Sequence, residues 1–203
     1  MGVASKVAGA LALGAGFGGV VSLSNDVASP FGVIGARIES TSWASAAEVA
    51  SLVLDAGWAW AGLAVAAGWV AGARGPGAVA GVLVLIAAAA GYYGLDSILR
   101  HEPFAGYWPE LRLWWVASVV CGSALGAVGA YVGRPGVTGL LAGLTVPVGA
   151  AVQMVLRPLG PVGLTVTPAM NWARLIVWTA AAAGVAVVVI RFVAAEQFRR
   201  PRG

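Results

Sequence analysis

Six long apolar runs dominate this chain of 203 residues and restrict what it can fold into. They cover approximately residues 4–23, 52–72, 78–94, 111–132, 137–156 and 172–190. Each run is about long enough for a helix to cross a ~30 Å hydrocarbon core at a rise of roughly 1.5 Å per residue. The runs therefore predict an all-α fold: a polytopic membrane bundle of six transmembrane helices.

The composition agrees with this class, since 60% of the residues are hydrophobic and 10% are charged. Soluble domains contain about 45–50% apolar and about 25% charged residues, and a soluble chain of this size cannot bury so much apolar surface. The 30 glycines are typical of helices that pack closely in lipid. We expect one integral membrane domain over residues 1–203, and we exclude disordered, nucleic-acid-binding and disulfide-scaffold proteins.

The first apolar run follows Lys6, a pattern that also describes a secretory signal peptide. Its length of about 17 residues exceeds the usual 7–15 residues of a signal peptide's apolar region. The sequence Asn25-Asp26-Val27-Ala28 is also a poor cleavage site. We therefore expect the first run to be retained as a span.

The distribution of basic residues predicts the orientation of the bundle. With six spans, seven of the 12 basic residues lie on the side of the two termini, and five lie on the other side. The seven are Lys6, Arg74, Arg134, Arg191, Arg199, Arg200 and Arg202. The positive-inside rule then places both termini, and the short basic tail at residues 191–203, in the cytoplasm.

Short turns rich in Gly, Pro and Arg separate the spans, at residues 73–77 and 133–136. They predict three tandem hairpins. The similarity of the turns results either from duplication of a hairpin or from the residues that ordinarily form turns between membrane helices. Before the second span, we expect a helical approach from Trp43 that continues straight into it. Pairs of small residues four apart predict close helix contacts: Gly14/Gly18, Gly68/Gly72, Gly77/Gly81, Gly122/Gly126, Gly129/Gly133 and Gly139/Gly143.

Polar residues near the outer ends of the spans are the candidate functional residues. Charges near a membrane boundary cost least when they pair with each other or line a wet cavity. The candidates therefore form either interfacial ion pairs or a polar vestibule that opens outward. They are Asp55, Asp96, Arg100, Gln153, Arg157, Asn171 and Arg174.

Two of these predictions concern particular charged residues. Asp55 is the acidic residue that we expect to lie deepest in the membrane, so we expect it to face the bundle interior and either to lie within ion-pair distance of Arg157 or Arg174 or to share water with one of them. At the C-terminus, Arg199, Arg200 and Arg202 serve either as a topology anchor or as a contact for anionic lipid.

Sequence motifs for catalysis and cofactor binding give no support to an enzyme. Residues 14–19 match the dinucleotide fingerprint G-x-G-x-x-G, but they lie inside a span, where tight helix packing explains the glycines. His101 is the single histidine, which argues against a zinc site. Ser123 lacks an activating histidine within a span. We expect no catalytic, cofactor or metal site.

Several short segments of the first half resemble a family of small six-span membrane proteins of actinobacteria that has no assigned activity. They are Asn25 after the first span, Gly57-Trp58 and Gly68 in the second, and Ala90-Gly91-Tyr92-Tyr93 at the end of the third. The resemblance implies the same six-span architecture in a bacterial plasma membrane, and it implies no site residues. The preference for Arg over Lys, with abundant Ala and Gly, is typical of a high-GC bacterial genome.

Two functions agree with these features. The first is a structural or accessory role for a small multi-pass membrane protein, whose partner is the lipid bilayer and not a nucleic acid. The alternative is a transporter or channel component that passes a small solute through the outer vestibule. Six spans are few for a complete carrier, so the alternative implies a homo-oligomer or a partner membrane subunit.

Overall fold

A computed structural model of the protein describes residues 3–38, 41–159 and 166–199. Within these ranges the regular structure is helical throughout. The elements are α1 (Val3–Ala28), α2 (Gly35–Ile38), α3 (Ser42–Leu54), α4 (Gly57–Ala71), α5 (Arg74–Arg100), the 3₁₀ helix η1 (Phe104–Tyr107), α6 (Trp108–Gly129), α7 (Val137–Leu156) and α8 (Pro168–Arg199).

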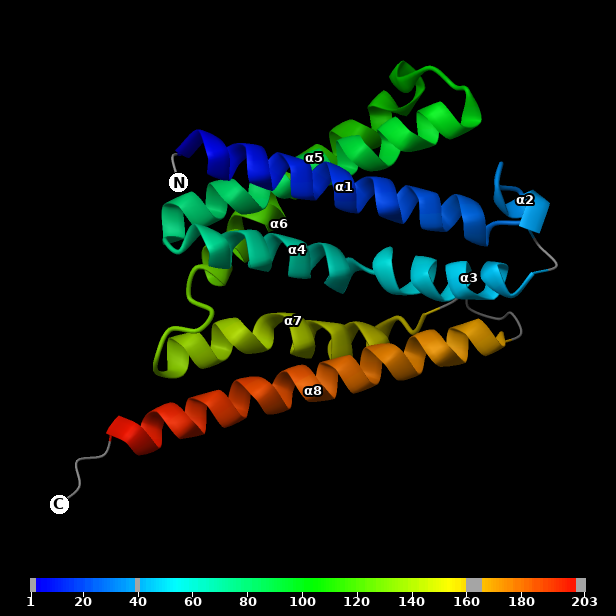
Figure 1. The fold of residues 1–203 in the computed structure, drawn as a ribbon. Helices are drawn as coiled ribbons and strands as arrows, with labels where there is room; N and C mark the ends of the chain where they lie inside the picture. Colours follow the sequence, from blue (N-terminus) through cyan, green and yellow to red (C-terminus); the bar gives the residue numbers. More distant parts are fainter. Residues whose placement is uncertain (1–2, 39–40, 160–165, 200–203) are drawn as a thin grey trace.

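Helix length and hydropathy identify the molecule as an integral membrane protein. In the described part of the chain, α1, α5, α6, α7 and α8 are each long and apolar enough to cross a membrane. The consecutive helices α3 and α4 provide a sixth crossing if they act as one bent span. The start of α1 and the end of α8 lie at the same end of the bundle (Figure 1), as an even number of crossings requires. The predicted all-α membrane bundle is confirmed.

The second span differs from the straight helix that the sequence predicts. The chain bends by 61° between α3 and α4, so the approach from Trp43 does not run straight into the span. Asp55 keeps a helical backbone, but Ala56 is extended, with φ −69° and ψ 140°. Ala56 is buried in a core cluster with residues of α7 and α8, so tertiary packing holds the break in place.

Helices α5 and α6 approach each other closely because glycines face one another across their interface. A methyl group added at Gly81 would overlap the Gly122 carbonyl, and one added at Gly126 would overlap the Gly77 carbonyl. Van der Waals contact at small residues is the main attraction between helices in lipid, where hydrophobic burial contributes little. The predicted pairs Gly77/Gly81 and Gly122/Gly126 therefore face each other and join these two helices.

The glycines of the apparent dinucleotide fingerprint also serve helix packing. Methyl groups at Gly14 and Gly18 would overlap the carbonyls of Val84 and Ala88 on α5, and Gly91 lies equally close to Ala15. As a result, α1 packs along α5 more extensively than along α3 or α4. The first of the three hairpins, α1 with α3 and α4, is thus less closely packed than the hairpin α5–α6.

Two core clusters result from this arrangement, and the broken span joins them. One cluster includes Ala56, Met154 and Val177, packed with residues of α3, α7 and α8. The other includes Ala64, Val84 and Leu85, where α4 meets α5 and α6. The break between α3 and α4 therefore belongs to the first cluster, where residues of α3, α7 and α8 meet.

Candidate functional site

The break in the second span brings polar groups of the backbone into the bundle. Helix α3 ends at Leu54, and the Asp55 N–H donates to the Ser51 carbonyl at 2.9 Å. At the start of α4, the Trp58 N–H donates to Oε1 of Gln153 on α7 at 3.1 Å. Helix starts leave N–H groups without an intrahelical partner, and an unsatisfied donor is costly in lipid. The Gln153 side chain therefore caps the N-terminus of α4.

Asn25 on α1 organises a polar network on the other side of the break. Its Oδ1 accepts a hydrogen bond from Ser51 Oγ at 2.6 Å, and its Nδ2 donates to the Tyr92 hydroxyl at 3.1 Å. The same side chain interacts with the Asp55 carboxylate. One amide thus connects α1, α3 and α5 with the break, which fixes the position of Asp55 relative to three spans.

A cavity of about 500 Å³ lies beside this network, lined by residues of α4, α5, α6 and the break. Its polar and aromatic lining includes Asp55, Trp60, Tyr92, Tyr93, Trp114 and Ser118. The remaining lining is mainly aliphatic, from residues such as Leu85 and Leu125. Among the described residues that line it, Asp55 alone is charged. Small-molecule sites typically have volumes of about 300–1,000 Å³ and apolar walls with a few convergent polar groups, which this cavity matches.

The cavity is a wedge between α4 and α6, with α5 behind it. The two helices touch near their other ends, where methyl groups at Gly68 and Gly129 would overlap the carbonyls of Gly126 and Val65. Toward the break they separate, and the cavity occupies the space between them. Asp55 is exposed there, and Trp114 is 53% exposed. The wedge is therefore open at the surface of the bundle.

The depth of the site follows from helix lengths. Asp55 lies about 24 Å along the helix axis from Ala71, at roughly 1.5 Å per residue. A hydrocarbon core is ~30 Å thick, so the break belongs to the outer third of the membrane if the termini are cytoplasmic. The residues of α6 that line the cavity extend it toward the middle of the bundle.

The structure separates the predicted vestibule residues into several groups. Asp55 lines the cavity, and Gln153 caps α4 beside it. Asp96 and Arg100 form an ion pair of 3.0 Å one helical turn apart on α5. Interfacial pairing therefore describes Asp96 and Arg100, whereas a polar vestibule shared by all seven residues stays a prediction.

The other three candidates lie on α7 and α8. Arg157 follows α7 and is exposed, as is Asn171 on α8. The Arg174 guanidinium donates to the Leu159 carbonyl at 2.9 Å. In the described part of the chain no ion pair joins Asp55 to Arg157 or Arg174. The direct ion pair is therefore not formed, because Asn25 on α1 and the cavity surround the Asp55 carboxylate, and water shared between Asp55 and one of these arginines stays a prediction.

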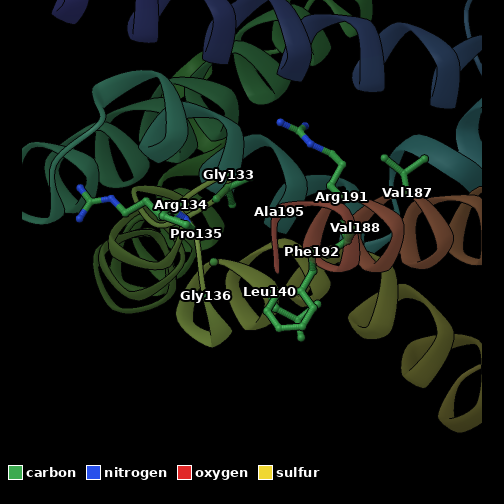
Figure 2. A pocket seen from close by; sticks show the side chains of 12 residues that line it. Gly133, Arg134, Pro135, Gly136, Leu140, Val187, Val188, Arg191, Phe192 and Ala195 are labelled. Atoms are coloured by element: carbon green, nitrogen blue, oxygen red, sulfur yellow. The ribbon is translucent and has the colours of Figure 1, made fainter. Parts of the chain in front are cut away.

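A second, smaller pocket of about 220 Å³ lies at the opposite end, between the α6–α7 turn and α8 (Figure 2). Arg134 and Arg191 line it, and their side chains extend in different directions. Arg134 donates to the Gly72 carbonyl at 2.9 Å and stacks on Tyr131, so it joins two turns. The tail residues Arg200 and Arg202, proposed to contact lipid, lie outside the described residues, and nothing is described of the Arg199 side chain.

Sequence reasoning did not assign a site role to Asn25, Trp60, Tyr92, Tyr93 or Trp114. One signal was present, because Asn25 stands at the end of an apolar run and Tyr92-Tyr93 stand inside another. Polar side chains at membrane depth are rare and usually face the bundle interior. The sequence does not indicate, however, that the four aromatic residues, from three spans, line one cavity, or that Asn25 on α1 donates to the Tyr92 hydroxyl beside it.

Comparisons of the chain with protein-family models, with curated proteins and with solved structures find no match.

Proposed function

We propose that this membrane protein binds a small solute in the cavity at the broken second span and takes part in moving it across the membrane. A cavity of about 500 Å³ that carries a single carboxylate beside a helix break is the observation that supports this function. Interrupted membrane helices place polar backbone groups and side chains at the substrate sites of many transporters. A purely structural bundle has no need of a carboxylate on such a cavity that forms no ion pair with the described residues.

The arrangement of the break also supports a role in movement. Helices α3 and α4 belong to two different core clusters, and the extended residue Ala56 joins them. Changes in the dihedral angles of the residue between two helices reorient one helix relative to the other, and such a movement here requires Ala56 to shift within its packing against α7 and α8. We propose that the protein works with a second copy or a partner membrane subunit, since six spans are few for a complete carrier.

Uptake by liposomes that contain the purified protein tests this function. We expect at least one small solute of a chemically varied panel to accumulate above the level of empty liposomes, with saturation. The variant Asp55→Asn removes the charge but keeps the side-chain shape, so it should lower this uptake strongly. The matched variant Asp96→Asn alters an ion pair outside the cavity and should leave uptake near the wild-type level. If no solute accumulates, or if both variants behave alike, the transport function is wrong.

A further inference from the structure

We propose that the cavity at the broken span takes a lipophilic organic cation, an amine or onium group on an apolar body. This inference rests on the proposed solute-binding function and specifies the class of solute. It follows from three properties of the cavity: the sign of its charge, the chemistry of its walls, and its opening between α4 and α6.

The charge around the cavity is negative. Asp55 is the single charged residue among the described residues of the lining. It also stands at the C-terminal end of α3, where the helix dipole places partial negative charge. The positive end of α4 does not offset this charge fully, because Gln153 Oε1 already accepts a hydrogen bond from its Trp58 N–H. An anionic solute would meet a carboxylate that forms no ion pair with a described basic residue, whereas a cation would be stabilised.

The walls favour an organic cation over a metal ion. Trp60, Trp114 and the two tyrosines present aromatic rings, and aromatic faces attract ammonium and other onium groups. In the described part of the chain, no group of three His, Cys, Asp or Glu residues can hold a metal ion. A hard cation requires about six oxygen ligands, which one carboxylate and a few hydroxyl groups do not provide. The aliphatic part of the lining instead suits an apolar body.

The opening of the cavity agrees with a solute that partitions into lipid. Glycine contacts hold α4 and α6 together at one end, and the gap between them lies at the end near Asp55. Trp114 is half-exposed at this gap and interacts with the Tyr93 hydroxyl group behind it. A lipophilic cation gathers at the membrane boundary, so it reaches this gap without crossing the packed bundle. The exposed Asp55 carboxylate is then the first charged group that it meets.

Binding of tetraphenylphosphonium to the full-length protein in detergent provides the test. Tetraphenylborate is the matched control ligand, because it has nearly the same shape and the opposite charge. We expect saturable binding of tetraphenylphosphonium and no saturable binding of tetraphenylborate. Quenching of tryptophan fluorescence measures the binding. Asp55→Asn should weaken the binding of the cation by about tenfold or more, since an ion pair in a partly apolar site is lost. Asp96→Asn should leave it unchanged.

A second variant separates the aromatic contribution from the carboxylate. Trp114→Leu should weaken binding of the cation by about three- to tenfold, as expected for the loss of a cation–π contact. The matched variant Trp172→Leu changes an exposed tryptophan outside the cavity and should have no effect. Each variant is first shown to keep the elution volume of the wild-type protein.

The outcomes distinguish this inference from the proposed function. Binding of tetraphenylborate at least as tight as that of the cation, or cation binding that is insensitive to Asp55→Asn, overturns the organic-cation site. If liposomes then accumulate a neutral or anionic solute in a way that depends on Asp55, transport stands and only the solute class is wrong. If tetraphenylphosphonium binds as expected but no solute accumulates in liposomes, the cation site stands and transport is wrong.

Discussion

At the scale of single residues, two amides hold the polar groups of the broken span. Asn25 links Ser51 and Tyr92 and interacts with Asp55, whereas Gln153 accepts from the backbone of α4. Hydrogen bonds between membrane helices contribute about 0.6 kcal/mol on average and at most about 1.7 kcal/mol each. Their larger role here is positional, because they fix the carboxylate beside the cavity.

Replacing Asn25 with Leu should lower the free energy of unfolding by about 1–2 kcal/mol, because two interhelical hydrogen bonds are lost. Thermal unfolding in detergent measures this change. The control is Asn171→Leu, which replaces an exposed asparagine on α8. Equal stability of the two variants would show that the hydrogen bonds of Asn25 do not stabilise the fold.

Replacing Gln153 with Met keeps the length of the side chain but removes the acceptor for the Trp58 N–H. We expect a loss of about 1–3 kcal/mol, the usual effect of leaving a buried donor unsatisfied. Gln197→Met, at an exposed position near the end of α8, serves as the matched control. Denaturant titration in mixed micelles compares the two variants. A wild-type midpoint for Gln153→Met would contradict the capping role.

At the scale of helices, glycine positions decide which spans become neighbours. Gly126 is central, because a methyl group there would overlap the Gly77 carbonyl, and methyl groups at Gly68 and Gly77 would in turn overlap the Gly126 carbonyl. Three helices, α4, α5 and α6, thus meet at one glycine. Their close contact at this end leaves the wedge at the other end, so the cavity is a consequence of where the glycines lie.

The variant Gly126→Val should destabilise the bundle by about 1–3 kcal/mol or more, since added volume at a close helix contact forces the backbones apart. Gly149→Val is a matched control, because a methyl group at Gly149 meets no atom within 4 Å. Thermal stability in detergent is the measurement. If both variants melt at the same temperature, α4, α5 and α6 do not depend on this contact.

At the scale of the whole molecule, the start of α1 and the end of α8 lie at one end of the bundle (Figure 1), which agrees with six crossings if α3 and α4 form one bent span. The loop between α5 and α6 belongs to the opposite end, and its 3₁₀ helix contains Ala105 to Tyr107. The side with the termini carries more basic residues, which favours a cytoplasmic position. The broken span and its cavity would then face the outer leaflet.

Reporter proteins fused at Gly203 and inserted within Ala105–Tyr107 test this orientation. We expect activity of a cytoplasmic reporter at Gly203 and of an external reporter at the loop, because seven of the 12 basic residues lie on the first side. Insertion of the same reporters after Gly72, in the turn between α4 and α5, should match the result at Gly203. Finding Gly203 and the loop on the same side would contradict six crossings.

The sequence by itself determined the class, the helical architecture and the positions of most spans. Hydropathy is a property of consecutive residues, and a bilayer imposes one length on every helix that crosses it, so no knowledge of neighbours is required. The same holds for the turns rich in Gly and Pro, which end helices through local backbone restrictions. Pairs such as Gly77/Gly81 also indicated close contacts, although they did not name the partner helix.

Only the tertiary structure decided the break at Ala56, the packing of α1 along α5, and the surroundings of Asp55. No proline marks the break; it is held by Gln153, far along the chain on α7, and by the burial of Ala56 among α7 and α8. The expected arginine partners of Asp55 were inferred from equal depth, but depth does not determine which helices are adjacent. Contacts between distant segments depend on which small residues meet, and a single sequence does not specify those pairings.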